Sequence, residues 1–211
     1  MNKTLLENRD YTVIMAKTAV DQGSKPPGFA DRWMAAQTAI LTLMQKCESL
    51  DPDGVTLYLA CRSPQEDCVF KKYERVKSLD LTQLIADNLP PERVNLLAVL
   101  QTALDDYIAR KTAGLNKLNG EMILVLLDGE PSDRMAVAKA IKAVTHQLDT
   151  NEELGIGFVQ IGEDMIARGY LAALDNHLEE AGAKFDIVDT KLLTAIRPDS
   201  LTEFLMGVLE D

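Results

Sequence analysis

The sequence is short of basic residues: 22 Lys and Arg stand against 33 Asp and Glu, and the formal net charge is −11. Binding to nucleic acid or to anionic lipid without sequence preference depends on clustered Lys and Arg. The deficit therefore argues against both, and we expect neither a nucleic acid nor a membrane as the partner.

Long hydrophobic runs are also missing, since no apolar stretch reaches the roughly 18 residues that a membrane-spanning helix needs. The first ten residues, MNKTLLENRD, are mostly polar and do not have the basic head and apolar stretch of a secretory signal. We therefore expect a cytoplasmic protein.

Cysteines are few, and their number is odd. Cys47, Cys61 and Cys68 do not have the spacing of a zinc site. Cys61 and Cys68 flank a predicted turn, where a hairpin would place them face to face. Three reduced, small core residues are the simpler interpretation and agree with a cytoplasmic location.

Catalytic motifs are missing as well. Gly155 and Gly157 in GIGFVQIG fall inside a predicted strand, not between a strand and a helix, so they do not form a dinucleotide-binding loop. The sequence has neither a Gly-x-Ser-x-Gly elbow nor a Gly-Lys-Ser/Thr phosphate loop. His146 and His177 lie on different predicted helices without a partner at ligand spacing. We predict that the protein is not an enzyme.

What the sequence does contain is a regular alternation of strand and helix patterns along its 211 residues, a length that suits one domain. The run from Met122 to Leu127 is unbroken and apolar, which is typical of a central parallel strand buried on both faces. The predicted strands are 11–15, 55–62, 68–76, 122–127, 154–162 and 184–189. The predicted helices are 31–47, 81–88, 94–114, 132–148, 163–180 and 200–209.

This order predicts an α/β fold: a Rossmann-like, doubly wound, mostly parallel six-stranded sheet with helices on both faces. The short turn between strands 55–62 and 68–76 makes that pair antiparallel, and the polar second strand suits an edge. The loops after the first and fourth strands should meet at the carboxyl end of the sheet, where such folds hold their ligands.

Several phrases carry a family resemblance over nearly the whole chain: NRDYTVIM, RWMAAQTAI, DPDGVTLYL, VNLLAVLQTALDDY, ILVLLDGEPSD, ELGIGFVQIG and KFDIVDT. With the element order, they resemble a von Willebrand factor A-type (vWA) domain, most closely the compact, bacterial, cytoplasmic kind. The resemblance implies a single domain over residues 1–211 and a six-stranded sheet whose third strand is antiparallel. It also implies a metal-ion-dependent adhesion site, usually for magnesium.

The resemblance places that site on an Asp-x-Ser-x-Ser sequence, a Thr from a second loop and an Asp after the fourth strand. In this chain, those positions fall on Ala16, Thr18, Val20, Val94 and Asp128. One hydroxyl and one carboxylate remain, too few hard oxygen ligands for tight magnesium binding. We therefore expect no metal cofactor, with Thr18 and Asp128 as vestiges of the site.

Two further hypotheses concern Asp128. Lys17 stands next to the lost Asp, and its ammonium group could pair with the Asp128 carboxylate as an internal cation. Alternatively, Asp128 accepts backbone hydrogen bonds and only shapes the turn that follows its strand. An opposing hypothesis to the loss of the metal site is that Asp21 and water molecules replace the lost ligands, so that magnesium still binds.

We predict a non-enzymatic protein-interaction module whose protein partner binds the rim formed by Lys17, Thr18, Val94, Asn95, Asp128 and Glu130. One alternative is a magnesium-dependent vWA adhesion or adaptor domain. The other is a small-ligand or enzymatic role at the same rim, with Asp128 and Glu130 as acids and Lys17 as a cation. That last alternative requires a concave pocket.

Overall fold

A computed structural model describes residues 3–18, 29–66, 68–131 and 133–210. Its centre is a six-stranded sheet with the strand order β3-β2-β1-β4-β5-β6. Neighbouring strands are parallel except for the antiparallel pair β2–β3. The strands are β1 (Asp10–Ala16), β2 (Val55–Cys61), β3 (Val69–Val76), β4 (Glu121–Leu127), β5 (Leu154–Gln160) and β6 (Val188–Leu192).

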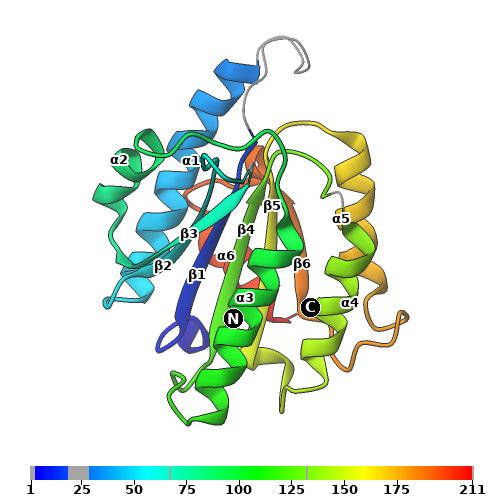
Figure 1. Ribbon diagram of the computed structural model, residues 1–211. Coiled ribbons are helices and arrows are strands. Elements are labelled where there is room, and N and C mark those ends of the chain that lie inside the picture. The colour runs from blue at the N-terminus through cyan, green and yellow to red at the C-terminus, as the bar shows by residue number, and fades with distance from the viewer. Residues whose placement is uncertain (1–2, 19–28, 67, 132, 211) are drawn as a thin grey trace.

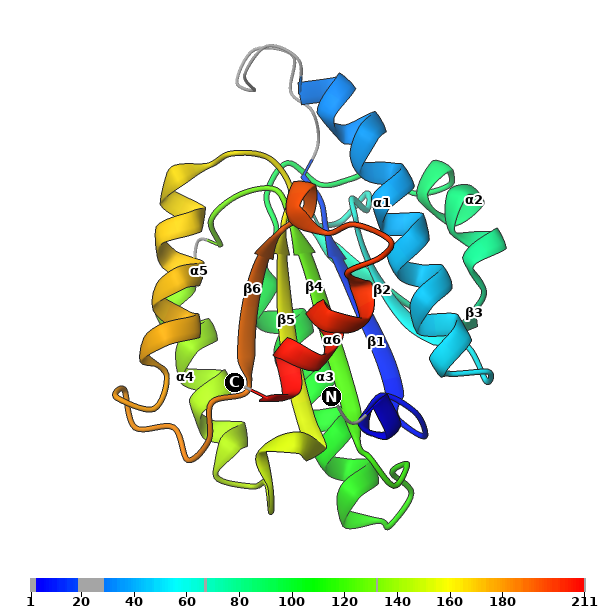
Figure 2. The same ribbon diagram turned by 180° about the vertical axis from the view of Figure 1, so that it is seen from behind.

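Helices cover both faces of this sheet (Figures 1 and 2). One apolar cluster packs α1 and α6 against one face, and a second packs α3, α4 and α5 against the other. The helices are α1 (Phe29–Leu50), α2 (Leu81–Ala86), α3 (Leu96–Thr112), α4 (Arg134–Thr145), α5 (Met165–His177) and α6 (Leu201–Glu210). Short 3₁₀ helices span Lys3–Leu5, Ser78–Asp80, Asn151–Glu153 and Leu193–Ala195.

The predicted fold class is confirmed, including the antiparallel edge strand. The unbroken apolar run of β4 is buried at every position, as its sequence predicted. Gly114 follows α3 with a φ of +69°, a conformation that favours glycine just past a helix end. Among the described residues, no helix is both long enough and apolar enough to cross a membrane.

The predicted bounds of the last strand were wrong, because β6 begins at Val188 and not at Lys184. Lys184, at the start of the predicted strand, is instead held by the last residue of α4 and by the segment that follows this helix. The backbone N–H of Lys184 donates to the Thr145 hydroxyl at 2.9 Å, and its ammonium group donates to the Leu148 carbonyl at 2.6 Å. These bonds fix the chain beside α4 until it reaches the sheet edge.

The pairing of β1 with β4 sets the geometry of the functional end. Their register runs from Asp10 opposite Glu121 to Ala16 opposite Leu127, so both strands end level. Successive strands extend from β1 in one direction and from β4 in the other, and the order of the sheet reverses between them. In open α/β sheets, such a switch point leaves a crevice at the carboxyl ends of the strands.

The opposite end of the same pair is anchored by Arg9, whose side chain is fully buried. Its guanidinium group donates to the carbonyl oxygens of Leu5 at 3.0 Å and Glu121 at 2.9 Å, and also to that of Glu152. Burial lowers the pKa of Arg9 to about 10, so the group stays charged at neutral pH. The carbonyl dipoles thus compensate a buried charge and tie β1 to β4 and to the segment before β5.

Glycines in β5 allow α6 to pack directly on the sheet. A Cβ atom at Gly157 would lie 2.8 Å from Leu124 Cδ2, 3.1 Å from Val208 Cγ2 and 3.3 Å from Phe204 Cζ. Gly157 therefore provides space under α6, which agrees with its predicted position inside a strand. The closing helix packs on this sheet through a buried apolar face.

We predict that Gly157→Val lowers the free energy of unfolding by about 1–3 kcal/mol, because the added carbons overpack the space beneath α6. Urea denaturation measures the change. The control is Gly169→Ala in α5, where an added Cβ meets nothing within 4 Å. That variant should be neutral or more stable by up to about 1 kcal/mol. Equal stability of Gly157→Val and the unchanged protein would contradict the packing described here.

Candidate functional site

A concave pocket of about 420 Å³ lies at the switch point between β1 and β4. Three segments form it: the end of β1 with the described residues 17–18, the loop leading into α3 and the loop after β4. Figure 1 shows these segments converging where the strand arrows end. The lining residues are Ala16, Thr18, Glu92, Arg93, Val94, Leu96, Leu127, Asp128, Gly129, Glu130 and Pro131.

Thr18 and Asp128 are joined across this pocket. The backbone N–H of Thr18 lies 3.3 Å from Asp128 Oδ1 and 3.2 Å from Oδ2. The Thr18 hydroxyl lies 3.2 and 3.0 Å from the same two oxygens. Asp128 is only 8% exposed, so these donors stabilise a largely buried carboxylate. They also connect the loop after β1 with the end of β4.

Apolar groups form much of the wall around this pair. Ala16 and Leu127 are each 3% exposed, and Leu96 is 1% exposed. Val94 is half-buried beside them. Three of the five ligand positions that the family resemblance implies carry apolar residues in this sequence. Two of these residues, Ala16 and Val94, line the pocket. The third, Val20, and the candidate rescue ligand Asp21 lie outside the described residues.

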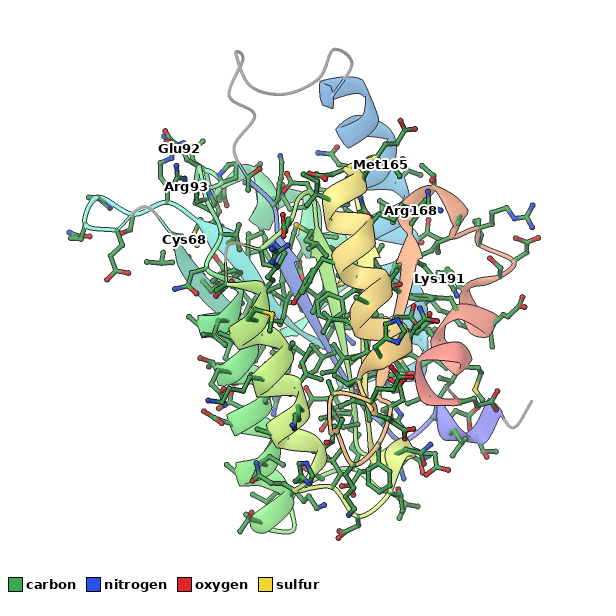
Figure 3. The ribbon with its side chains drawn as sticks, turned by 90° about the vertical axis from the view of Figure 1, so that its right-hand side faces the viewer. Cys68, Glu92, Arg93, Met165, Arg168 and Lys191 are labelled. Carbon is green, nitrogen blue, oxygen red and sulfur yellow. The ribbon has the colours of Figure 1, made fainter. Side chains whose placement is uncertain are left out.

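Charged side chains surround the opening. Glu92 and Arg93 are exposed at the pocket edge, and Figure 3 shows them projecting at this end of the molecule. Glu130 forms an ion pair with Arg134 one helical turn later, at 2.6 Å. The rim therefore presents both signs of charge around an apolar wall. Sequence reasoning named the loop that contains Glu92 and Arg93 but did not select either residue.

The remaining predicted rim residues have other positions. Asn95 is the N-cap of α3, where its side-chain oxygen accepts a hydrogen bond from the backbone N–H of Ala98 at 3.2 Å. Its place is explained by helix capping. Lys17 is half-buried next to the pocket but does not line it. Its pairing with Asp128 stays a prediction.

Asp133 connects the start of α3 with the start of α4. One of its carboxylate oxygens accepts a hydrogen bond from the backbone N–H of Leu97 at 3.1 Å. Asp133 is also the N-cap position of α4. It thereby links the amino ends of α3 and α4, the helices that follow two of the pocket loops. Over the described ranges, no cluster of three or more His, Cys, Asp and Glu side chains is arranged to hold a metal ion.

No known protein family matches the sequence in a profile comparison, and no curated protein matches it. Solved structures do match the fold. The manganese-loaded TRAP protein of Plasmodium vivax is similar with a TM-score of 0.55 and 10% identity, over 96% of this chain and 74% of TRAP.

Two further structures have comparable similarity. Proximal thread matrix protein 1 from the mussel byssus matches with a TM-score of 0.52 and 13% identity, over 97% of this chain and 48% of its own. The D319A mutant of the PilB minor pilin from Streptococcus sanguinis matches with a TM-score of 0.51 and 8% identity, over 96% of this chain and 61% of the pilin chain. With the strand order and the antiparallel edge strand, these similarities identify the fold of this chain as that of a von Willebrand factor A-type domain.

Proposed function

We propose that this chain is a single vWA-type domain over residues 1–211 that binds a protein partner, without catalysis and without a bridging metal ion. The observation that carries the proposal is the pocket at the β1–β4 switch point. It has the place of a vWA ligand site, but its wall is largely apolar and its buried carboxylate is hydrogen-bonded internally.

The oxygens present do not fit magnesium. Magnesium requires near-octahedral oxygen coordination, usually from one or two carboxylates and several waters. Of the five family positions, only Thr18 and Asp128 offer an oxygen-bearing side chain. The Thr18 hydroxyl lies at hydrogen-bonding distance from both Asp128 oxygens, so the two groups satisfy each other. This donor set supports a degenerate site.

Recognition would then depend on shape, apolar contact and the charged rim. The half-buried Val94 provides the apolar centre, with the buried Ala16 beneath the pocket surface. Glu92, Arg93 and Glu130 provide polar contacts around it. Protein interfaces commonly combine an apolar centre with a polar, solvent-accessible rim. We therefore expect a complex with the partner to persist in a strong chelator.

A second candidate function is binding of a small ligand, and the concave shape of the pocket favours it. A volume of about 420 Å³ lies in the range of small-molecule sites. Arg93 offers a cation at the edge, and Thr18 and Asp128 offer polar groups inside. This function would use the same loops but would not require a protein partner.

Restoring the missing oxygens should restore metal binding. We predict that the triple variant Ala16→Asp, Val20→Ser and Val94→Thr binds magnesium and manganese in isothermal titration calorimetry, whereas the unchanged chain gives no binding heat. Adding Asp128→Ala to the triple variant is the control and should abolish the gain. The proposal that the metal site is lost would be contradicted if the unchanged chain bound magnesium or manganese and the single variant Asp128→Ala did not.

The Thr18–Asp128 contact should stabilise the domain. We predict that Thr18→Val, which replaces the hydroxyl with a methyl group of similar size, lowers the free energy of unfolding by about 1–2 kcal/mol. Thr18→Ser keeps the donor and should cost less. Urea denaturation separates the two variants. Identical stabilities of Thr18→Val and Thr18→Ser would show that the hydroxyl contact contributes nothing.

A thermal-shift screen distinguishes the two candidate functions. A ligand present at 100 times its Kd stabilises the folded state by about 2.7 kcal/mol, which raises Tm by several degrees. The leading proposal predicts no such shift with nucleotides, phosphates or divalent ions. A shift that disappears in Arg93→Gln and persists in Arg197→Gln, a surface control outside the pocket lining, would favour the small-ligand function instead.

A further inference from the structure

A second surface feature lies away from the rim pocket, on the outer side of α4 and α5. The two helices run side by side over one face of the sheet, as Figures 1 and 3 both show. Between them lies an apolar groove of about 590 Å³. It follows α4 from Met135 to His146, a length of about 17 Å at 1.5 Å per residue. It follows the other side from Tyr170 to Ala181.

The floor of the groove consists of small and apolar side chains. Ala143 and Ala173 are exposed on the two helices, and the buried Leu174 and Leu178 lie in the floor. Small residues allow another helix to approach closely, at the 8–10 Å axial distances that are typical of packed helices. Met135, which is 78% exposed, adds a large apolar side chain at one end of the groove. The shape and length suit a helix of about three turns.

The charge of this surface is opposite to that of the whole chain. The segment 134–148 contains Arg134, Lys139 and Lys142 but no Asp or Glu. The residues lining the groove likewise include no acidic side chain, and both histidines of the sequence, His146 and His177, are among them. In a chain with a net charge of −11, the positive charge of the groove lining comes from Lys139 and Lys142, while the exposed Glu179 and Glu180 stand outside the lining.

Four of these groups have partners within the domain. Arg134 pairs with Glu130, and His146 Nε2 lies 3.0 Å from the Gly182 carbonyl oxygen. Lys142 donates to the Ala181 carbonyl at 2.7 Å and so supports the segment after α5. His177 lies 3.2 Å from Glu180, which stands outside the groove. Lys139 is exposed, and its side chain lines the groove. Lys139 is therefore the residue best placed to meet a partner's carboxylate.

A second copy of this chain is a poor occupant. A two-fold pairing of this face would place the same patch on both sides of the interface. Lys139 and Lys142 of the two copies would then lie in one contact, and like charges disfavour it. A partner of opposite charge avoids this repulsion and gains electrostatic complementarity.

We propose that the α4–α5 groove docks an amphipathic helix of a partner protein, with its apolar stripe on the alanine-rich floor and with Asp or Glu residues flanking that stripe. Lys139 pairs with one of these acidic residues. In helix-in-groove recognition of this kind, apolar residues at positions i, i+3, i+4 and i+7 of the bound helix contact the groove. The groove is separate from the rim pocket, so the inference does not depend on the function proposed above.

The test uses the full chain as bait and a displayed library of 14-residue peptides as probe. Leu is fixed along one helical face, and every flanking position is free to be Glu, Gln or Lys. We expect the selected peptides to carry Glu at the flanking positions. With Lys139→Glu as bait, the selection should shift toward Lys.

Two matched variants locate the binding site. Ala143→Glu places a bulky, acidic side chain in the groove and should weaken the selected peptides at least tenfold in fluorescence anisotropy. Ala172→Glu makes the same change on the other side of α5, in a hollow beside β6, and should leave their affinity within twofold. Both variants must keep the unchanged chain's Tm, and Glu is a good helix former at an exposed position.

Three results would overturn the proposal. The first is that no library peptide is retained by the unchanged chain. The second is that the flanking positions have the same composition with the unchanged bait and with Lys139→Glu. The third is that Ala143→Glu and Ala172→Glu weaken binding equally. Tenfold weakening confined to Ala143→Glu, together with the charge shift, supports it.

Discussion

The parallel pairing of β1 with β4 is the constraint on which the rest of the structure depends. Their register places Ala16 opposite Leu127, so the next residues of the two strands leave the sheet at the same level. The Thr18 backbone and hydroxyl can then reach the Asp128 carboxylate. At the other end, the buried Arg9 joins the same strands through carbonyl oxygens. A pocket at the switch point follows from this pairing, whatever the pocket binds.

The chemistry inside the pocket differs from what its position suggests. In a metal-dependent site, the carboxylate after the fourth strand would take part in coordinating a cation. Here the donors of Thr18 lie at hydrogen-bonding distance from both oxygens of Asp128, and Ala16 and Val94 supply carbon where oxygen ligands would be expected. Under the proposed function, apolar groups at these positions would favour a partner that is not bridged by a metal ion. An apolar centre with a mixed-charge rim suits a protein surface.

The fold could be predicted from the sequence because its strongest signals are local. The apolar run of β4, the short β2–β3 turn and Gly114 after α3 each indicate one structure without reference to distant residues. The start of β6 could not be predicted, because it depends on contacts of Lys184 with residues 36 and 39 positions earlier. Patterns within a short segment contain no information on such contacts.

The site was predictable in part for the same reason. Family phrases located Thr18, Val94 and Asp128 at the pocket, since they mark the ends of predicted strands and the entry to a helix. Glu92 and Arg93 were missed, because an exposed charged pair in a loop has no pattern that distinguishes it from other surface charge. The α4–α5 groove was missed too, since it exists only through the lateral packing of two helices.

The most direct test of the central claim, that this rim does not hold a divalent cation, is paramagnetic broadening of amide NMR signals by manganese. The account predicts that the amides of Thr18 and Gly129 lose intensity no faster than that of the surface residue Asp199. Selective loss of the Thr18 and Gly129 signals at low manganese concentration, reversed by excess magnesium, would contradict it.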